Sequence, residues 1–207
     1  YDLIVFDEVE QAIPHIWGGT MNGPRTEMAY TTITALLKAA KQVIVMDAHL
    51  SDITSNWLHE IRGDCTRIQN TYRHQWGLVT HYPSEAALIA AAERCAEQNK
   101  GPVVISTGSR RAARTYQRHF SAIYGEEAVK AVHGWNSGSK AARDLVEHIN
   151  DRLPGLRIFI CSPSVGTGVD IKARVAGVFG YFTPEPLPAT HILQQMARFR
   201  NADERGV

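Results

Sequence analysis

The stretch Leu3-Ile4-Val5-Phe6-Asp7-Glu8 runs from four apolar residues straight into two adjacent carboxylates. An apolar run of this kind is typical of a strand that is buried on both faces of a parallel sheet. Strands of that kind present functional groups at their carboxyl ends. The stretch therefore predicts an α/β fold with Asp7 and Glu8 at the edge of a sheet.

Two neighbouring carboxylates at such an edge can share the work of phosphoryl transfer. Asp7 is expected to hold a hydrated Mg²⁺ on nucleotide phosphates, because magnesium prefers oxygen ligands and keeps several of its waters. Glu8 is expected to orient or deprotonate the attacking water. A strand end followed by a solvated acidic turn would show the same residues, so the stretch alone leaves both interpretations open.

Other segments also join a buried strand to polar or glycine-rich residues. Residues 158–171 read IFICSPSVGTGVDI, an apolar strand that leads into a glycine-rich turn ending in Asp. Residues 43–50 (VIVMDAHL) and 103–109 (VVISTGS) have a similar form, and residues 194–200 read QQMARFR. Strands that alternate with helices in this way indicate a parallel sheet covered on both faces.

The order of these segments resembles that of motifs II, V and VI in superfamily 2 helicases of the DEAD/DEAH-like kind. Residues 43–50 stand where motif III belongs, and residues 103–109 resemble motif IV. The variants DEVE, MDAHL, GTGVD and QxxARxR look most similar to herpesvirus-type origin-binding proteins and helicase-bearing plasmid replication proteins. The resemblance covers nearly the whole chain.

The resemblance implies two RecA-like parallel-sheet lobes, the first of them incomplete. Residues 1–75 would be the C-terminal part of the first RecA-like domain, residues 76–83 a linker and residues 84–207 the second RecA-like domain. It also implies ATP and Mg²⁺ as cofactors and nucleic acid as the partner, DNA rather than RNA. The intact protein would be an ATP-hydrolysing helicase or translocase that acts in the replication of a plasmid, phage or virus.

Motif VI of the resemblance implies cationic groups for the nucleotide phosphates. Arg198 and Arg200 would be arginine fingers, since a guanidinium binds phosphate oxygens bidentately and stays charged. Gln194 would brace the motif, and Ala197 stands where the family usually has Gly. The arginines would face the acidic pair of motif II across a crevice between the lobes. A solvated helix face is the alternative interpretation.

Motif V of the resemblance implies contacts with the nucleotide. Gly166 and Gly168 would let the backbone approach a ligand closely, and Asp170 would accept a ribose hydroxyl or an arginine. An ordinary strand-to-loop turn with an Asp cap remains the alternative. In motif III, Asp47 and His49 would couple the two lobes, although a turn that bonds its own backbone would look the same.

Nucleic-acid contacts are expected along the carboxyl edges of both sheets. The helix after motif IV begins with a basic pair, and backbone N–H groups at a helix start attract phosphate. Trp135 follows another strand and would either place a ring near bases or anchor its loop by packing. The residues expected to contact nucleic acid are Ser106, Thr107, Ser109, Arg110, Arg111, Ser162 and Thr167.

Composition limits the classes of function. The 207 residues are 44% hydrophobic and carry a net charge of +1, so nucleic-acid binding would depend on local basic clusters. Three isolated cysteines disfavour a disulfide framework or a zinc site. No apolar run is long enough to span a bilayer. A cytoplasmic location is expected, or the host nucleus if the protein is viral.

A phosphate-binding loop of the form GxxxxGK[ST] does not occur in the sequence. By the resemblance it would precede motif II, so we expect it upstream of Tyr1 in a longer protein. The chain by itself is then expected to hydrolyse ATP negligibly. Two other classes remain open: a catalytically silent RecA-like scaffold that binds nucleic acid or protein, and a nucleotide-sugar transferase with two doubly wound domains.

Periodicity and capping residues predict the individual elements. Ser84 and Ser109 are expected to cap helices, as is Ser51 or Asp52. Gly18 to Pro24 is expected to be a loop. The expected helices cover residues 28–40, 52–61, 85–98, 110–120, 140–150 and 191–198, and the expected strands begin at residues 3, 43, 65, 103, 129, 158 and 175.

Overall fold

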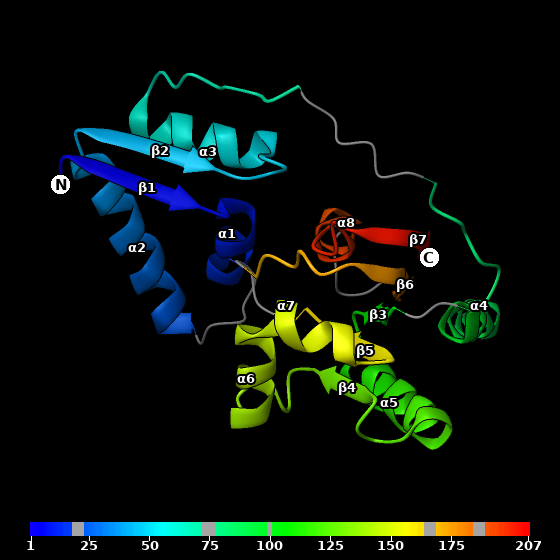
Figure 1. Ribbon diagram of the computed structural model, residues 1–207. Helices are drawn as coiled ribbons and strands as arrows, with labels where there is room; N and C mark the ends of the chain where they lie inside the picture. The colour runs from blue at the N-terminus through cyan, green and yellow to red at the C-terminus, as the bar shows by residue number, and fades with distance from the viewer. Residues whose placement is uncertain (18–22, 72–77, 99–100, 164–168, 184–188) are drawn as a thin grey trace. The chain divides into compact units, whose positions relative to one another are not determined.

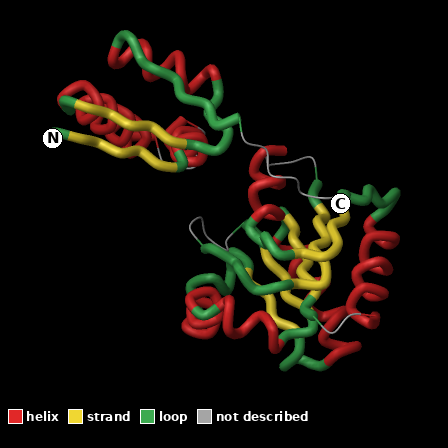
Figure 2. Tube along the Cα trace, turned by 45° about the horizontal axis from the view of Figure 1, so that its top comes forward, coloured by secondary structure: helices red, strands yellow, loops and turns green. Residues whose placement is uncertain are grey.

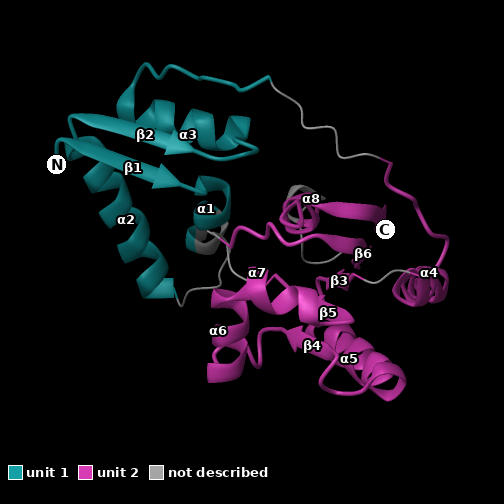
Figure 3. Cartoon of the chain, in the orientation of Figure 1, with its two compact units in different colours: residues 1–73 teal, residues 74–207 magenta. Residues whose placement is uncertain are grey.

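The chain divides into two compact units, Tyr1–Arg73 and His74–Val207 (Figure 3). The computed structural model describes residues 1–17, 23–71, 78–98, 101–163, 169–183 and 189–207. Each unit has a parallel sheet and an apolar core of its own.

The first unit contains a two-stranded parallel sheet, β1–β2 (Figure 1). Leu3 pairs with Gln42, and Asp7 pairs with Met46, so the two strands end side by side. Three helices pack on this sheet. The elements are β1 (Leu3–Asp7), α1 (Val9–Trp17), α2 (Gly23–Ala39), β2 (Gln42–Met46) and α3 (Asp52–Arg62).

One face of the β1–β2 sheet carries the core of the first unit. Its inward side chains pack against residues from all three helices, among them Val9, Leu37 and Trp57. The prediction that β1 is buried on both faces is wrong for the described residues, because α1, α2 and α3 all pack on the same side. The other face carries Leu3, Val5, Ile44 and Met46, which are 43–52% exposed.

Three predictions for the first unit need correction. Helix α1 occupies residues after the carboxylate pair where no helix was expected, and its Val9, Ile13 and Ile16 are buried at helical spacing. Helix α2 begins at Gly23, inside the expected loop. Residues 65–70 form no strand, and Ile68 is 89% exposed because no neighbouring strand pairs with this segment.

The second unit is a five-stranded parallel sheet in the order β4-β5-β3-β6-β7. Its first strand, β3, lies in the middle, with later strands added on both sides. Helices follow β3, β4 and β6 as crossover connections. The elements are α4 (Glu85–Gln98), β3 (Val103–Thr107), α5 (Arg110–Tyr124), β4 (Val129–Val132), α6 (Lys140–Glu147), α7 (Ile149–Arg152), η1 (Leu153–Gly155), β5 (Ile158–Cys161), β6 (Val175–Tyr181), α8 (Ala189–Ala197) and β7 (Ala202–Gly206).

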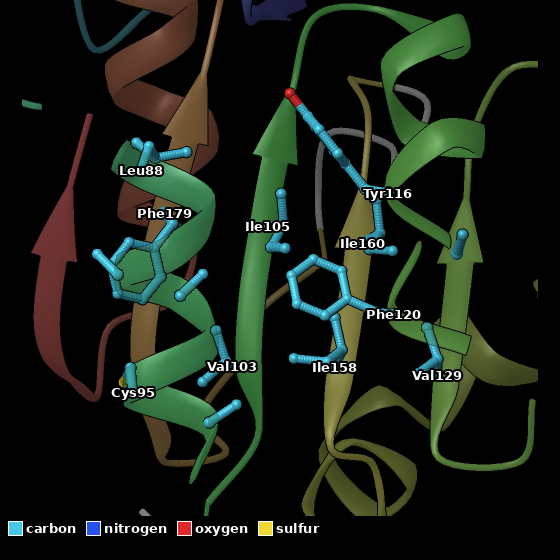
Figure 4. Close-up of a cluster of buried hydrophobic side chains, with 14 of the residues drawn as sticks. Leu88, Cys95, Val103, Ile105, Tyr116, Phe120, Val129, Ile158, Ile160 and Phe179 are labelled. Atoms are coloured by element: carbon cyan, nitrogen blue, oxygen red, sulfur yellow. The ribbon is translucent and has the colours of Figure 1, made fainter. Parts of the chain in front are cut away.

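Helices cover both faces of this sheet (Figure 2). On one face, Leu88 of α4 and Phe120 of α5 pack on alternate strand residues such as Ile105 (Figure 4). On the other face, residues from α6, α7 and α8 pack on the residues between, such as Val104. Strands buried on both sides explain the nearly continuous apolar runs of β3 and β5.

Two elements of the second unit differ from the prediction. The expected helix over residues 140–150 is divided at His148 into α6 and α7. Strand β7 was not predicted, because its sequence ADERG contains no apolar run. The strand forms by pairing with β6, where Gly177 lies opposite Glu204 and Phe179 opposite Gly206. In the described part of the chain, no helix is both long and apolar enough to cross a bilayer.

Candidate functional site

The acidic pair lies where β1 ends and α1 begins. Asp7 is exposed, Glu8 is partly buried, and the Asp7 Oδ1 atom accepts a hydrogen bond from the Glu8 N–H at 3.0 Å. The Glu8 carboxylate accepts from Gln11 Nε2 at 2.7 Å. Glu8 has a φ of 56°. Among the non-glycine residues that the structure describes, it alone has a positive φ. Strain of this kind concentrates at functional positions, so Glu8 is marked by its backbone as well as by its charge.

The donor set at this strand end suits a hard cation. Among the described residues, no group of three or more His, Cys, Asp or Glu side chains is arranged to hold a metal ion. Magnesium nevertheless needs only one or two carboxylates when phosphates and waters supply its other ligands. The exposed carboxylate of Asp7 fits that requirement.

Asp47, from the segment after β2, is tied directly to the segment after β1. Its Oδ2 atom accepts from the Glu10 N–H at 3.0 Å, and its Oδ1 atom accepts from the His49 N–H at 2.8 Å. In return, the Glu10 carboxylate accepts from the Ser51 N–H at 2.7 Å. The two strand ends are therefore cross-linked in both directions, while His49 stays exposed.

Glu10 is a residue that the sequence analysis missed. It belongs to the quoted DEVE stretch, but only the first two of its acidic residues were assigned a role. Its position three residues after Asp7, in the same acidic stretch, was the sequence signal that could have identified it. What it contacts could not be read from spacing, because Ser51 lies far along the chain.

The candidate nucleic-acid residues at the ends of β3 and β5 lie at the carboxyl edge of the second sheet, but they differ in exposure. Ser106 and Thr107 are fully buried and Ser162 is 2% exposed. The Ser109 hydroxyl caps α5 by accepting from the Ala112 N–H at 3.3 Å. Ser109 is partly buried, and the exposed side chains of this group are those of Arg110 and Arg111. Thr167 lies outside the described residues.

The carboxyl end of the neighbouring strand β5 is also buried. Cys161 is buried, and burial raises the pKa of its thiol to about 11. Gln195 is also buried and donates from Nε2 to the Cys161 carbonyl at 3.5 Å. The charge of the partly buried Arg198 acts on the same thiol. Gln195 therefore links α8 to β5. Its neighbour Gln194, which was expected to brace motif VI, is partly exposed.

The predicted motif V and motif VI segments lie side by side. Ile171 and Phe199 form a parallel β-bridge, and the Arg200 Nε atom lies 3.5 Å from Asp170 Oδ1. Lys172 Nζ lies 3.5 Å from the other carboxylate oxygen of Asp170. Asp170 thus forms an ion pair with an arginine of the predicted motif VI segment. Gly166 and Gly168 lie outside the described residues.

Two further residues support these segments and were missed in the sequence. Asn150 donates to the Asp170 carbonyl at 2.9 Å and accepts from the Lys172 and Ala173 N–H groups at 2.6 and 3.0 Å. Arg205 is 7% exposed and donates to the Phe199 carbonyl at 2.8 Å. Neither role has a local signal, because each depends on packing between distant segments.

The structure thus assembles two groups of the predicted residues. Asp7, Glu8 and Asp47 lie together in the first unit. Asp170 and Arg200 lie together in the second.

Comparisons with known proteins agree with this fold. The family described as "Origin of replication binding protein" matches residues 1–75. An uncharacterized protein of Picosynechococcus sp. is 27% identical, over 86% of this chain and 20% of that protein. A structure of S. cerevisiae Dbp5 bound to Gle1 and IP6 matches with a TM-score of 0.58 and 16% identity, over 100% of this chain and 52% of that one. The yeast DEAD-box splicing factor Prp28 matches with a TM-score of 0.49 and 15% identity, over 99% and 45%.

The chain spans about one fifth of the curated relative and about half of the Dbp5 chain. The likeness to Dbp5 shows a RecA-like fold. The predicted class, α/β with RecA-like parallel-sheet lobes, is therefore confirmed.

Proposed function

We propose that the chain contributes to an ATP-dependent helicase or translocase motor that acts on DNA in replication. The observation that carries the proposal is the cross-linked pair of strand ends in the first unit, with a strained Glu8 beside an exposed Asp7. The family match over residues 1–75, to origin of replication binding proteins, supports the link to replication. The RecA-like fold supports the motor.

In this proposal the acidic pair prepares the hydrolysis of ATP. Asp7 holds Mg²⁺ on the nucleotide phosphates, and Glu8 orients the attacking water and takes its proton. The ion, when held by Asp7, would supply positive charge for the phosphate oxygens. The bonds from Asp47 to the Glu10 and His49 N–H groups would transmit a shift of one strand end to the other, which is the coupling role proposed for Asp47 and His49.

The second unit supplies the cationic groups. Arg198 and Arg200 would bind the phosphates, with Asp170 and Gln194 placing them. The Asp170–Arg200 pair is 3.5 Å long and its side chains are 43% and 69% exposed. Exposed pairs of this kind contribute only about 0–1 kcal/mol, so Arg200 can exchange Asp170 for a phosphate at little cost. Gly166 and Gly168 would admit the nucleotide close to the backbone.

Strand contacts would lie at the carboxyl edge of the second sheet. Arg110 and Arg111 are exposed there at the start of α5, where the helix dipole also favours phosphate. Ser109 caps that helix start. Since the chain spans about one fifth of its curated relative, we propose this activity for the intact protein.

The test is ATPase turnover of the intact protein with and without single-stranded DNA. Glu8→Gln should lower kcat by about 100-fold or more, since it removes the general base. Arg198→Ala should lower it by about 1,000-fold, the scale of an arginine finger. Glu60→Gln and Arg118→Ala replace exposed residues of the same types and should leave turnover unchanged. Near-normal turnover in both site variants would remove these roles, and DNA binding without any turnover would favour a scaffold.

A further inference from the structure

The loop after β4 carries an exposed indole held by two arginines. Trp135 is 64% exposed. The guanidinium carbon of Arg110 lies 5.4 Å from the centroid of the indole, and that of Arg114 lies 4.9 Å from it. Both arginines come from α5, one turn apart, so a single helix positions both groups against the ring. Contacts of this length are attractive cation–π interactions.

Hydrogen bonds fix the loop that presents this ring. The Asn136 side chain donates to the Ala131 carbonyl at 2.7 Å and accepts from the His133 N–H at 2.8 Å. The Asn136 N–H donates back to the His133 carbonyl at 2.9 Å. Further along, Arg143 donates to the Gly138 carbonyl at 2.7 Å. Trp135 therefore projects from an ordered turn, which lowers the entropy lost when its ring binds a ligand.

The surroundings of the ring are cationic. Within the described chain, no ion pair joins Arg110, Arg111 or Arg114 to a carboxylate. Asp144, on the helix that follows the loop, is already paired with Arg152 at 2.8 Å. Burial, together with the charges of Arg114 and Arg110, lowers the pKa of His133, which favours its neutral form. The positive charge beside the ring therefore comes from the arginines.

A packing role does not account for this arrangement. An indole that anchors a loop is normally buried, and Trp135 belongs to neither core cluster of the second unit. Among the residues that the structure describes, the buried Nδ1 atom of His133 in the same turn has no hydrogen-bond partner. A flat aromatic surface flanked by guanidinium groups that form no ion pair within the described residues matches a nucleobase joined to phosphate: the ring stacks on the base, and the cations attract the backbone.

We propose that Trp135, with Arg110 and Arg114, forms a base-stacking position for single-stranded nucleic acid. That nucleic acid is the partner follows from the proposed motor function. The present proposal adds the site at which the nucleic acid binds. It lies at the carboxyl edge of the second sheet, beyond the end of β4. Stacking of this kind is tolerant of sequence, because every base has an aromatic face.

The test compares the binding of two oligonucleotides to the 207-residue chain by fluorescence anisotropy: a short oligothymidylate, and an abasic strand of the same length and charge. Trp135→Leu should weaken oligothymidylate binding by about 5- to 100-fold, the range that stacking gives. The same variant should bind the abasic strand as the wild type does. Trp135→Phe, which keeps an aromatic face, should retain most of the affinity for oligothymidylate.

The arginines have a matched control on the same helix. Arg114→Gln should weaken the binding of both strands, whereas Arg118→Gln, which replaces an exposed arginine with no ring contact, should have a smaller effect. Thermal melting should be unchanged in Trp135→Leu, since the ring is exposed. An equal loss on both strands, or no loss on either, would overturn the stacking position.

The test of the stacking position can fail or succeed independently of the test of the motor proposal. Glu8→Gln in the intact protein tests hydrolysis and leaves the loop after β4 untouched. If the intact protein shows no ATPase turnover with or without DNA while Trp135→Leu loses its preference for bases, the motor proposal fails and the stacking position stands. If the wild-type chain binds neither strand at low salt, the stacking position is wrong, whatever the ATPase result.

Discussion

At the scale of single residues, Glu8 combines chemistry with backbone strain. Its φ of 56° lies in the left-handed region, which costs an L-residue about 1–2 kcal/mol. The cost is tolerated because the strain turns the chain from β1 into α1 and leaves Asp7 at the surface. A carboxylate kept at a strained position is expected where the side chain has a function.

Comparing Glu8→Gly with Glu8→Ala isolates that strain. Both variants lose the hydrogen bond from Gln11, but only glycine adopts the left-handed conformation without steric cost. We expect the glycine variant to be more stable than the alanine variant by about 1 kcal/mol, measured by urea unfolding. The intact protein carrying either change should lose ATPase activity. If alanine proved the more stable, Glu8 would not be strained.

At the scale of elements, the helix ends show two kinds of support. Ser51, Ser109 and Ser139 cap the starts of α3, α5 and α6 through local hydrogen bonds. The end of α2 is supported from a distance by Arg62 of α3. Its guanidinium donates to carbonyls at the end of α2 and just beyond, those of Leu37, Lys38, Ala40 and Lys41, at 2.9–3.2 Å.

Arg62→Ala should therefore destabilise the first unit. Hydrogen bonds from a charged group contribute about 1.5–3 kcal/mol, and several carbonyls would lose their donor together. We expect a loss of about 2 kcal/mol in the free energy of unfolding of this unit, followed by circular dichroism in urea. Lys38→Ala removes a cation from the same helix end without removing these bonds, and should cost less than about 0.5 kcal/mol. Equal effects of the two changes would contradict a specific cap.

At the scale of the whole molecule, the two units differ in how completely their sheets are covered. The second has apolar clusters on both faces of its sheet, whereas the described residues of the first cover one face only. Isolated two-stranded sheets are marginal in water. We therefore expect residues 74–207, produced alone, to unfold in one cooperative transition, and residues 1–73 alone to be much less stable.

Packing in the second unit offers a check on that expectation. A Cβ atom at Gly177 would lie 2.7 Å from Phe179 Cε2 and 3.0 Å from Cys95 Sγ, whereas one at Gly138 would meet nothing within 4 Å. In the 74–207 segment, Gly177→Ala should lower stability by about 1–3 kcal/mol and Gly138→Ala by much less. A segment that shows no cooperative transition, or that tolerates both changes equally, would not have the core described above.

Local patterns in the sequence predicted the parts of the fold that depend on local physics. The apolar runs of β3 and β5 predicted buried strands, and Ser84 and Ser109 predicted where two helices begin. The carboxylates after β1 were found for the same reason, since a strand end is visible in the sequence as the point where an apolar run stops.

Tertiary structure alone decided the features that depend on partners distant in the chain. The polar strand β7 exists because β6 pairs with it, and Arg205 is buried because the turn after α8 offers it carbonyl groups. Trp135 gains its cationic setting only when β4 ends beside the start of α5. Periodicity reports which face of an element is apolar, but the sequence alone does not say which neighbour will meet that face, because topology sets those contacts.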